Sequence, residues 1–338
     1  MYTAGHGAND PENINLVNSM RQLSRYIPHA IVVLFAAWCL ISLRGDVAQM
    51  TFEPLIRSWG LVVLALLLSL LNYLLRIIRW RSYLAKLGAP LGFRFAALSY
   101  CAGFAYTVSP GKVGEMVRAR YYLPLGVPLP AVTAAFLSER ILDLLSVTAL
   151  AALVFATSAR YEVAFVAALI LIVVALGAIA LLPWAALSAW LKSAVAIPGA
   201  IRTLLAGVAS ALASTRTLLR PRVLATGFAI GLLAWGLEGA GLGLLSTMFS
   251  VPQLSLPHAI GIYGIAMLLG GLSLLPGGLG GTEAVMTALL VASGFPVSQA
   301  LLLTLTCRLV TLWFAVCLGW IAVFLLRQRA APVVLPWP

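Results

Sequence analysis

The chain has 338 residues, of which 62% are hydrophobic and only 9% are charged, and its mean hydropathy is +1.02. This composition excludes a water-soluble globular domain, and the net charge of +12 does not indicate nucleic-acid binding, because the basic residues flank apolar runs. We therefore expect an all-α polytopic membrane protein. The sequence has no nucleotide-binding, zinc-protease or dinucleotide motif, so we expect no cofactor, no metal, no catalytic residue and no enzymatic activity.

In chain order, apolar runs predict about six transmembrane helices, near residues 27–43, 59–78, 130–157, 162–183, 222–249 and 298–326. Two further apolar stretches, 93–123 and 257–294, are interrupted midway by Pro-Gly, and each half is too short to cross a bilayer. We predict a re-entrant helical hairpin in each stretch. The alternative is a pair of ordinary helices kinked by proline.

These elements predict a simple domain organisation. A cytoplasmic segment, 1–26, precedes a single membrane domain, 27–329, and a cytoplasmic tail, 330–338. Within the membrane domain, segment 184–221 alternates apolar with basic residues, which is typical of amphipathic helices lying in the membrane interface.

The basic residues also predict the orientation of the chain. If both hairpins return to the side from which they enter, 14 Lys and Arg residues lie on one side and three on the other. The positive-inside rule then places both termini in the cytoplasm of a bacterium, with the domain in its cytoplasmic (inner) membrane. The larger set includes Arg76, Arg79, Arg81 and Lys86, which we expect to anchor the cytoplasmic interface. Arg76 and Arg79 lie near enough to the membrane to contact a lipid headgroup instead.

A spacing pattern occurs twice in the chain. Glu-x10-Gly-x-Pro-x11-Arg runs from Glu115 to Arg140 and again from Glu283 to Arg308, each time after a Pro-Gly break. The pattern predicts an internal duplication, with repeat one at 59–157 and repeat two at 222–326. The predicted crossings make the two copies enter from opposite sides, which is the inverted-topology repeat of many secondary transporters.

Ionisable residues interrupt the apolar runs at membrane depth, where a charge costs about 2.5–3.5 kcal/mol. They must therefore face one another or a water-filled cavity. We predict that they bind substrate in a cavity between the hairpins; the alternative is structural ion pairing, such as Glu115 with Arg140 or Glu283 with Arg308. The candidate substrate-binding residues are Lys112, Glu115, Arg118, Glu139, Arg140, Asp143, Glu238, Glu283 and Arg308.

The Pro-Gly breaks predict where an anion binds. Free backbone N–H groups at the start of a returning half-helix attract anions, and glycines let a ligand approach the backbone. Lys112, Arg118 and Arg140 would suit a phosphate there, and Glu115 and Glu283 would open the two returning half-helices. The residues assigned to the breaks are Pro110, Gly111, Gly114, Pro276, Gly277, Gly278, Gly280 and Gly281. Separately, Gly239 and Gly243 predict close helix packing.

Four segments, NYLLRIIRWRSYL, SPGKVGEMVRARYY, SERILDLL and LLPGGLGGTEAV, resemble the lysylphosphatidylglycerol synthase transmembrane-region (flippase-like) family, and the resemblance covers about residues 20–328. It implies a lipid translocase that moves an anionic or aminoacylated phospholipid, or a polyprenyl-phosphate-linked sugar, between leaflets. The motif residues would then line or shape its pathway. Family members that synthesise lysylphosphatidylglycerol carry a large soluble domain after the membrane part, whereas this sequence ends at Pro338. We therefore expect a stand-alone member without synthase activity.

Three functions remain open at this point. The first is a flippase or scramblase, the second an ion-coupled transporter of a small solute, and the third a non-transporting accessory subunit of a lipid-modifying glycosyltransferase. The partners expected are membrane lipids with phosphate headgroups, with protons or ions as coupling species. A second copy of the chain or a lipid-modifying enzyme is the protein partner expected, and nucleic acid is not.

Overall fold

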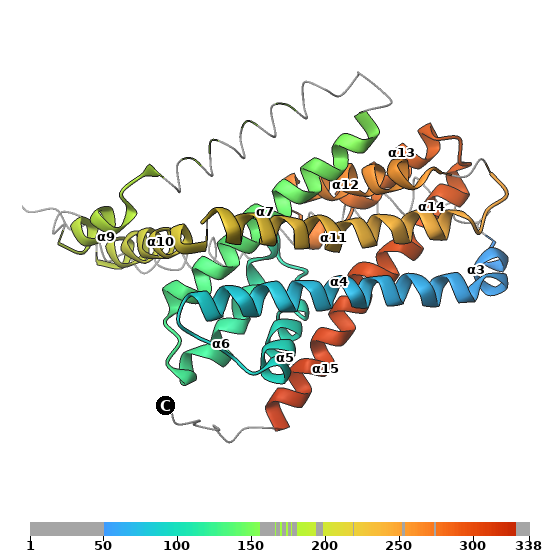
Figure 1. Cartoon of the computed structure of the whole chain (residues 1–338). Helices are drawn as coiled ribbons and strands as arrows, with labels where there is room; N and C mark the ends of the chain where they lie inside the picture. Colours follow the sequence, from blue (N-terminus) through green and yellow to red (C-terminus); the bar gives the residue numbers. More distant parts are fainter. Residues whose placement is uncertain are drawn as a thin grey trace, which may run out of the picture. The chain divides into compact units, whose positions relative to one another are not determined.

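The computed structural model describes residues 51–155, 181–193, 199–218, 220–251, 254–273 and 275–328, with the isolated positions 166, 170, 174 and 177. All regular secondary structure in these residues is helical (Figure 1). The predicted span 27–43, most of the span 162–183, the segment 1–26 and the tail 330–338 lie outside the described residues.

Long apolar helices carry the fold. A short helix, α3 (Glu53–Arg57), precedes α4 (Trp59–Lys86). Together with α11 (Pro221–Ser246) and the continuous helix Val297–Gln328, α4 is long and apolar enough to cross a bilayer core of about 30 Å. The last of these comprises α14 (Val297–Arg308), the π-helix η5 (Leu309–Trp313) and α15 (Phe314–Gln328). The prediction of an all-α polytopic membrane protein is confirmed.

Helix α7 (Leu129–Phe155) matches the predicted span 130–157 in length, with 27 residues. It carries three charged residues near its middle, Glu139, Arg140 and Asp143. These charges have to be matched by other elements, and their positions therefore define the candidate site described below.

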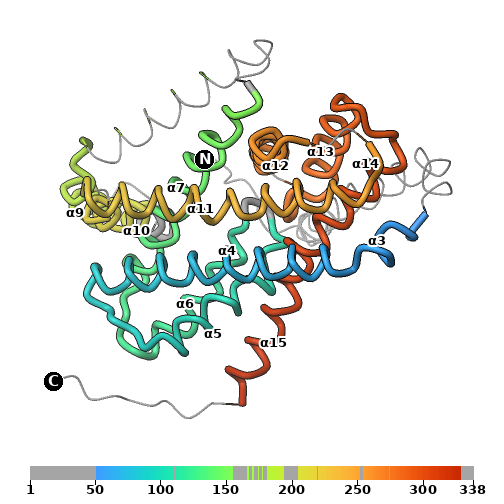
Figure 2. Tube along the Cα trace, turned by 45° about the vertical axis from the view of Figure 1, so that its right-hand side comes forward, coloured from blue at the N-terminus to red at the C-terminus, as the bar shows by residue number. Residues whose placement is uncertain are grey.

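Helices α4 and α11 lie side by side (Figures 1 and 2). Arg79 of α4 donates a hydrogen bond to the Gly227 carbonyl of α11 at 3.3 Å, whereas Arg76 of α4 lies 5.4 Å from the Trp235 ring centroid. Residue numbers therefore fall along α4 as they rise along α11, so the two helices are antiparallel.

The two interrupted stretches form short helices around their breaks. The first comprises α5 (Phe93–Phe104), the 3₁₀-helix η1 (Pro110–Arg118), α6 (Ala119–Tyr122) and the 3₁₀-turn η2 (Leu123–Leu125). The second comprises α12 (Leu256–Leu272), the 3₁₀-turn η4 (Pro276–Gly278) and α13 (Gly281–Ala292). Because α5 and α13 have 12 residues each, and 12 helical residues extend only about 18 Å, neither crosses a bilayer core alone.

The two predicted repeats exchange partners in their packing. α5 of the first repeat packs against α15 of the second, and α12 of the second packs against α7 of the first. The breaks themselves meet, because η1 contacts η4 and a Cβ added at Gly277 would lie 3.4 Å from the Cα of Val108. This reciprocal exchange is the packing expected of two related units, and it brings the two breaks together.

The segment between the repeats folds as a helical pair, α9 (Trp184–Ser193) and α10 (Gly199–Leu218). Leu191 packs against Ala206 and Ala209, and the Ser188 hydroxyl donates to the Ala206 carbonyl at 3.0 Å. α10 also packs against α7. The position of this pair in the membrane interface stays a prediction.

The prediction that Gly239 and Gly243 mark close helix packing is confirmed. A Cβ added at Gly239 would lie 2.7 Å from the Cα of Ile260, and one at Gly243 would lie 3.1 Å from the Cβ of Ala259. Both contacts join α11 to α12, so these glycines let the two backbones approach closely.

Gly239→Ala should therefore destabilise the protein by about 1–3 kcal/mol, because the new methyl group meets backbone that cannot move aside. Gly236→Ala, on the same helix, is the matched control, since a Cβ there meets nothing within 4 Å. Thermal unfolding in detergent should show a lower midpoint for Gly239→Ala alone. Equal midpoints for the two variants would contradict the packing of α11 on α12.

Candidate functional site

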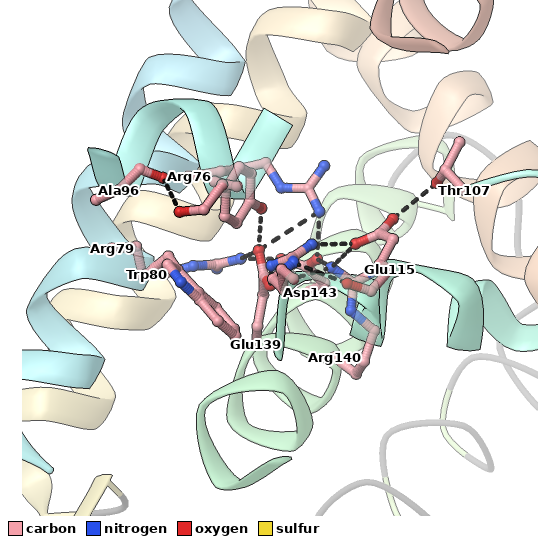
Figure 3. A network of polar contacts seen from close by, with 12 residues as sticks. Arg76, Arg79, Trp80, Ala96, Thr107, Glu115, Glu139, Arg140 and Asp143 are labelled. Atoms are coloured by element: carbon pink, nitrogen blue, oxygen red, sulfur yellow. Dashed lines mark hydrogen bonds and ion pairs between the residues drawn. The ribbon is translucent and has the colours of Figure 1, made fainter. Parts of the chain in front are cut away.

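Seven charged side chains from three elements meet between α4, the first break and α7 (Figure 3). We call this group the arginine–carboxylate cluster. Its members are Arg76 and Arg79 from α4, Glu115 and Arg118 from η1, and Glu139, Arg140 and Asp143 from α7.

The α4 arginines pair with the α7 acids. Arg76 Nη2 lies 3.3 Å from Asp143 Oδ2, and Arg79 contacts the other carboxylate oxygen of Asp143. Both arginines also lie 3.6 Å from Glu139 Oε1. Residues three or four positions apart share one face of a helix, so the spacing on α4 and on α7 aligns two charged faces.

Arg118 bridges the break and α7. Its Nη2 lies 2.6 Å from Glu115 Oε2, and its Nη1 lies 3.1 Å from Glu139 Oε2. The guanidinium packs against two neighbouring aromatic rings, with its carbon 4.5 Å from the Trp80 centroid and 4.2 Å from the Tyr100 centroid. Such a planar cation, stacked on rings and bonded to two acids, is held in one orientation.

Neutral side chains complete the hydrogen bonding of the acids. The Tyr100 hydroxyl donates to Glu139, and the Thr107 hydroxyl donates to Glu115 Oε1 at 2.7 Å. Glu115 and Glu139 are each only 1% exposed, so these donors satisfy oxygens that water does not reach.

Arg140 differs from the other members of the cluster. Its side chain is 20% exposed, whereas that of Asp143, the next most exposed, is at 7%. Arg140 Nη2 lies 3.1 Å from Asp143, 3.5 Å from Glu139 and 3.7 Å from Glu115. Neither its Nη2 nor its Nε makes a hydrogen bond with any described residue. Arg140 therefore holds two buried nitrogens that make no hydrogen bond with a described residue, and one of them, Nη2, takes part in these ion pairs.

The cluster is not balanced in charge, because four guanidinium groups face three carboxylates. Lys112 in η1 adds a further cation. Its amine lies 5.4 Å from the Trp235 ring centroid, and no carboxylate of the described residues lies within ion-pair distance of it. An excess of positive charge in a buried region favours the binding of an anion.

The first break departs from the sequence prediction. Glu115 does not open a returning α-helix; it lies inside η1, which begins at Pro110 and Gly111. The Gly114 N–H donates to the Ser109 hydroxyl at 2.8 Å, and the Lys112 N–H donates to the Ser109 carbonyl at 2.9 Å. Because Ser109 occupies these backbone donors, the first break presents side chains, not a free helix start, to an anion.

The glycine in this break is required by close contact. A Cβ added at Gly114 would lie 2.4 Å from the Tyr106 carbonyl oxygen. Lys112, by contrast, holds a left-handed backbone conformation, with φ of 57°. This conformation is unfavourable for a side chain other than glycine or asparagine, so the surrounding turn fixes the direction in which Lys112 leaves the backbone.

The second break is stabilised by its own ion pair. Glu283, in the first turn of α13, accepts the Gly280 N–H at 2.6 Å and lies 2.6 Å from Arg308 Nε. Arg308 Nη2 donates to the Gly277 carbonyl at 2.9 Å. Pro276, Gly277 and Gly278 form η4, and Gly280 and Gly281 begin α13. Here one cation meets one acid, which leaves no excess charge in the pair.

Glu238 lies apart from the cluster. It is on α11, is 6% exposed, and accepts a hydrogen bond from the Tyr263 hydroxyl of α12. Among the described residues, no basic group lies within ion-pair distance of its carboxylate. Of the nine predicted substrate-binding residues, the structure thus brings five into the cluster, places Lys112 beside Trp235, and pairs Glu283 with Arg308.

Comparison with known proteins assigns the chain to a family. Residues 26–319 match the family described as Lysylphosphatidylglycerol synthase TM region. The chain belongs to this family. A curated relative, a "UPF0104 membrane protein" of Methanothermobacter thermautotrophicus, is 37% identical over 92 residues, which are 27% of this chain and 27% of that protein. Membership supports a membrane protein with a lipid-related function.

In this member of the family, the sequence prediction for Arg76 and Arg79 was wrong. They do not anchor the interface: they are 4% and 0% exposed and belong to the cluster. The i, i+3 spacing of the two arginines within an apolar run was the sequence signal that could have indicated their burial. No sequence pattern indicated that Trp80, Tyr100 and Thr107 contact the charged residues of the cluster.

Proposed function

We propose that the protein is a membrane-embedded translocase, a flippase or scramblase, that moves an anionic phospholipid or a polyprenyl-phosphate-linked lipid between leaflets. The observation that carries the proposal is the excess positive charge of the cluster together with Lys112. Arg140, two of whose nitrogens make no hydrogen bond with a described residue, and Lys112, which has no carboxylate of the described residues within ion-pair distance, would bind the phosphate. The remaining arginines and acids hold these two groups in place.

The unequal charges argue against purely structural ion pairing. A structural network is most stable when each buried charge is matched, because an unmatched buried charge costs several kcal/mol. The Glu283–Arg308 pair is matched in charge, and its atoms are bonded within the second break. The cluster is not matched, because it has one more guanidinium group than carboxylates. A negatively charged ligand would balance the charge of the cluster.

A lipid fits better than a small solute for two reasons. The family is lipid-related, and α4, which supplies two cluster arginines, presents exposed apolar residues along its length. Leu67, Leu70 and Leu74 are between 39% and 54% exposed, as expected for a surface that faces lipid chains. A headgroup could therefore enter the charged region while its acyl chains remain against α4.

Translocation requires no bond to be made or broken, so the proposal assigns no catalytic residue. The two predicted repeats, whose helices pack against one another and whose breaks are in contact, would rock against each other around the bound headgroup, as inverted repeats do in secondary transporters. The cytoplasmic location of both termini and the bacterial inner membrane belong to the proposal.

The proposal is tested by reconstituting the full chain in phosphatidylcholine vesicles that contain fluorescent phosphatidylglycerol. Dithionite, added outside, should quench the inner-leaflet label in protein-containing vesicles and only the outer-leaflet label in protein-free vesicles. Fluorescent phosphatidylcholine is the neutral control and should move more slowly. Mass spectrometry of lipids that copurify with the protein then identifies the headgroup. Uptake of glycerol phosphate without lipid movement would favour the solute transporter, and movement of neither would favour the accessory subunit.

A further inference from the structure

Glu238 is a buried carboxyl group for which the described part of the chain supplies no basic partner within ion-pair distance. It lies in the apolar span α11, and among the described residues its side chain is hydrogen-bonded by the Tyr263 hydroxyl alone. An ionised carboxylate held only by a neutral hydroxyl is costly in such a place, whereas a protonated carboxyl is tolerated. The group is therefore suited to take up and release a proton.

Unsatisfied polar groups surround the same position. Trp235, one turn earlier on α11, has a buried indole N–H without a partner among the described residues, and Asn72 of α4 is 0% exposed with both amide atoms unpaired. The antiparallel register places Arg79 at Gly227 and Arg76 at Trp235. One further turn brings Asn72 level with Glu238. Buried polar groups without partners are the usual sites of internal water, which a proton requires to reach the carboxyl.

The charged and titratable groups nearest Glu238 lie on α4, η1, α12 and α14. Arg76 is paired with Asp143, and Arg308 with Glu283, so Lys112 is the one cation of this set without an acid. α7 also packs against α11, but its Arg140 and Asp143 belong to the cluster. Tyr263 of α12 donates to the Glu238 carboxylate, and Arg76 of α4 and Lys112 of η1 each lie 5.4 Å from the Trp235 ring centroid, one turn from Glu238. The other titratable groups considered are Tyr73 of α4 and Cys307 and Arg308 of α14, on two helices that pack against α11.

We propose that Glu238 couples lipid movement to protons: it binds one proton when an anionic headgroup binds at Lys112 and Arg140, and releases it when the headgroup leaves. This inference rests on the proposed function. The physical reason is competition for one positive charge. The ionised Glu238 carboxylate and a bound phosphate both draw on the field of Lys112, so the arrival of one anion favours neutralisation of the other. The proton comes from water and forms an O–H bond on the carboxylate.

Because binding free energies are reciprocal, lipid binding must drive proton uptake as strongly as protonation drives lipid binding. The test adds dihexanoyl-phosphatidylglycerol to the detergent-solubilised full chain in weak buffer with a pH-indicator dye, while calorimetry measures binding. At a pH where Glu238 is ionised in the lipid-free protein, the wild-type protein should take up as much as about one proton per bound lipid. Glu238→Gln should bind the lipid and take up none. Glu53→Gln, the same change at an exposed acid of α3, should behave as wild type.

A second measurement uses the wild-type protein alone. As the pH rises and Glu238 loses its proton, the affinity of the wild-type protein for the same lipid should fall by up to about tenfold per pH unit. Binding without proton uptake, or uptake undiminished in Glu238→Gln, would overturn the proton-coupling inference and leave the translocase proposal standing. Failure of the wild-type protein to bind the anionic lipid at any pH would instead overturn the translocase proposal and this inference with it.

Discussion

Arg140→Gln should lower the rate of anionic lipid translocation by roughly tenfold to a hundredfold, because a charge-assisted contact to phosphate contributes about 1.5–3 kcal/mol. The protein should still fold. Arg140 is the most exposed member of the cluster, and the acids beside it keep other partners: Glu115 and Glu139 keep Arg118, and Asp143 keeps Arg79.

Arg120→Gln is the matched control for this change. Arg120 is an exposed arginine of α6, outside the cluster, so its replacement removes the same charge without touching the candidate site. Dithionite quenching gives the rate, and thermal unfolding in detergent gives the stability. Wild-type transport by Arg140→Gln would exclude a substrate role for this residue. Loss of folding would show that it serves structure.

Arg118→Met should have the opposite outcome and prevent stable folding. Its guanidinium is 0% exposed and bonds both Glu115 and Glu139, which are themselves buried. Removing one partner of a buried ion pair leaves an uncompensated charge and costs about 3–5 kcal/mol. The variant should therefore show a much lower yield of monodisperse protein and a lower unfolding midpoint.

Arg118→Lys separates charge from geometry at the same position. Lysine keeps the positive charge but lacks the planar fork that bonds two acids and packs against Trp80 and Tyr100. Its stability should lie between those of the wild type and Arg118→Met. If Arg118→Met were as stable as the wild type, the cluster would not hold the first break in place.

Much of the fold could be predicted from the sequence. Apolar runs report helix length directly, so the spans predicted at 130–157, 222–249 and 298–326 agree with α7, α11 and the helix Val297–Gln328 to within a few residues. The Pro-Gly dipeptides located both breaks. The pairs Glu115–Arg140 and Glu283–Arg308 were named as examples of structural ion pairing, the alternative to substrate binding, and both lie within ion-pair distance, at 3.7 Å and 2.6 Å.

The interior of the site could not be predicted in the same way. An arginine near the end of an apolar run looks the same in the sequence whether it extends to the interface or is buried. Arg76 and Arg79 are buried because they pair with acids of α7, which are distant in the chain. The 3₁₀ conformation of the first break depends on Ser109, which takes up two backbone N–H groups, and on the left-handed backbone of Lys112.

The central claim is that the cluster holds a lipid phosphate through Arg140 at membrane depth. Solid-state NMR tests it most directly, by measuring ¹⁵N–³¹P dipolar contacts between ¹⁵N-arginine protein and phosphatidylglycerol bilayers. The wild-type protein should show a guanidinium–phosphorus contact that Arg140→Gln loses and Arg120→Gln retains. Identical ¹⁵N–³¹P contacts in the wild-type and Arg140→Gln proteins would contradict the claim.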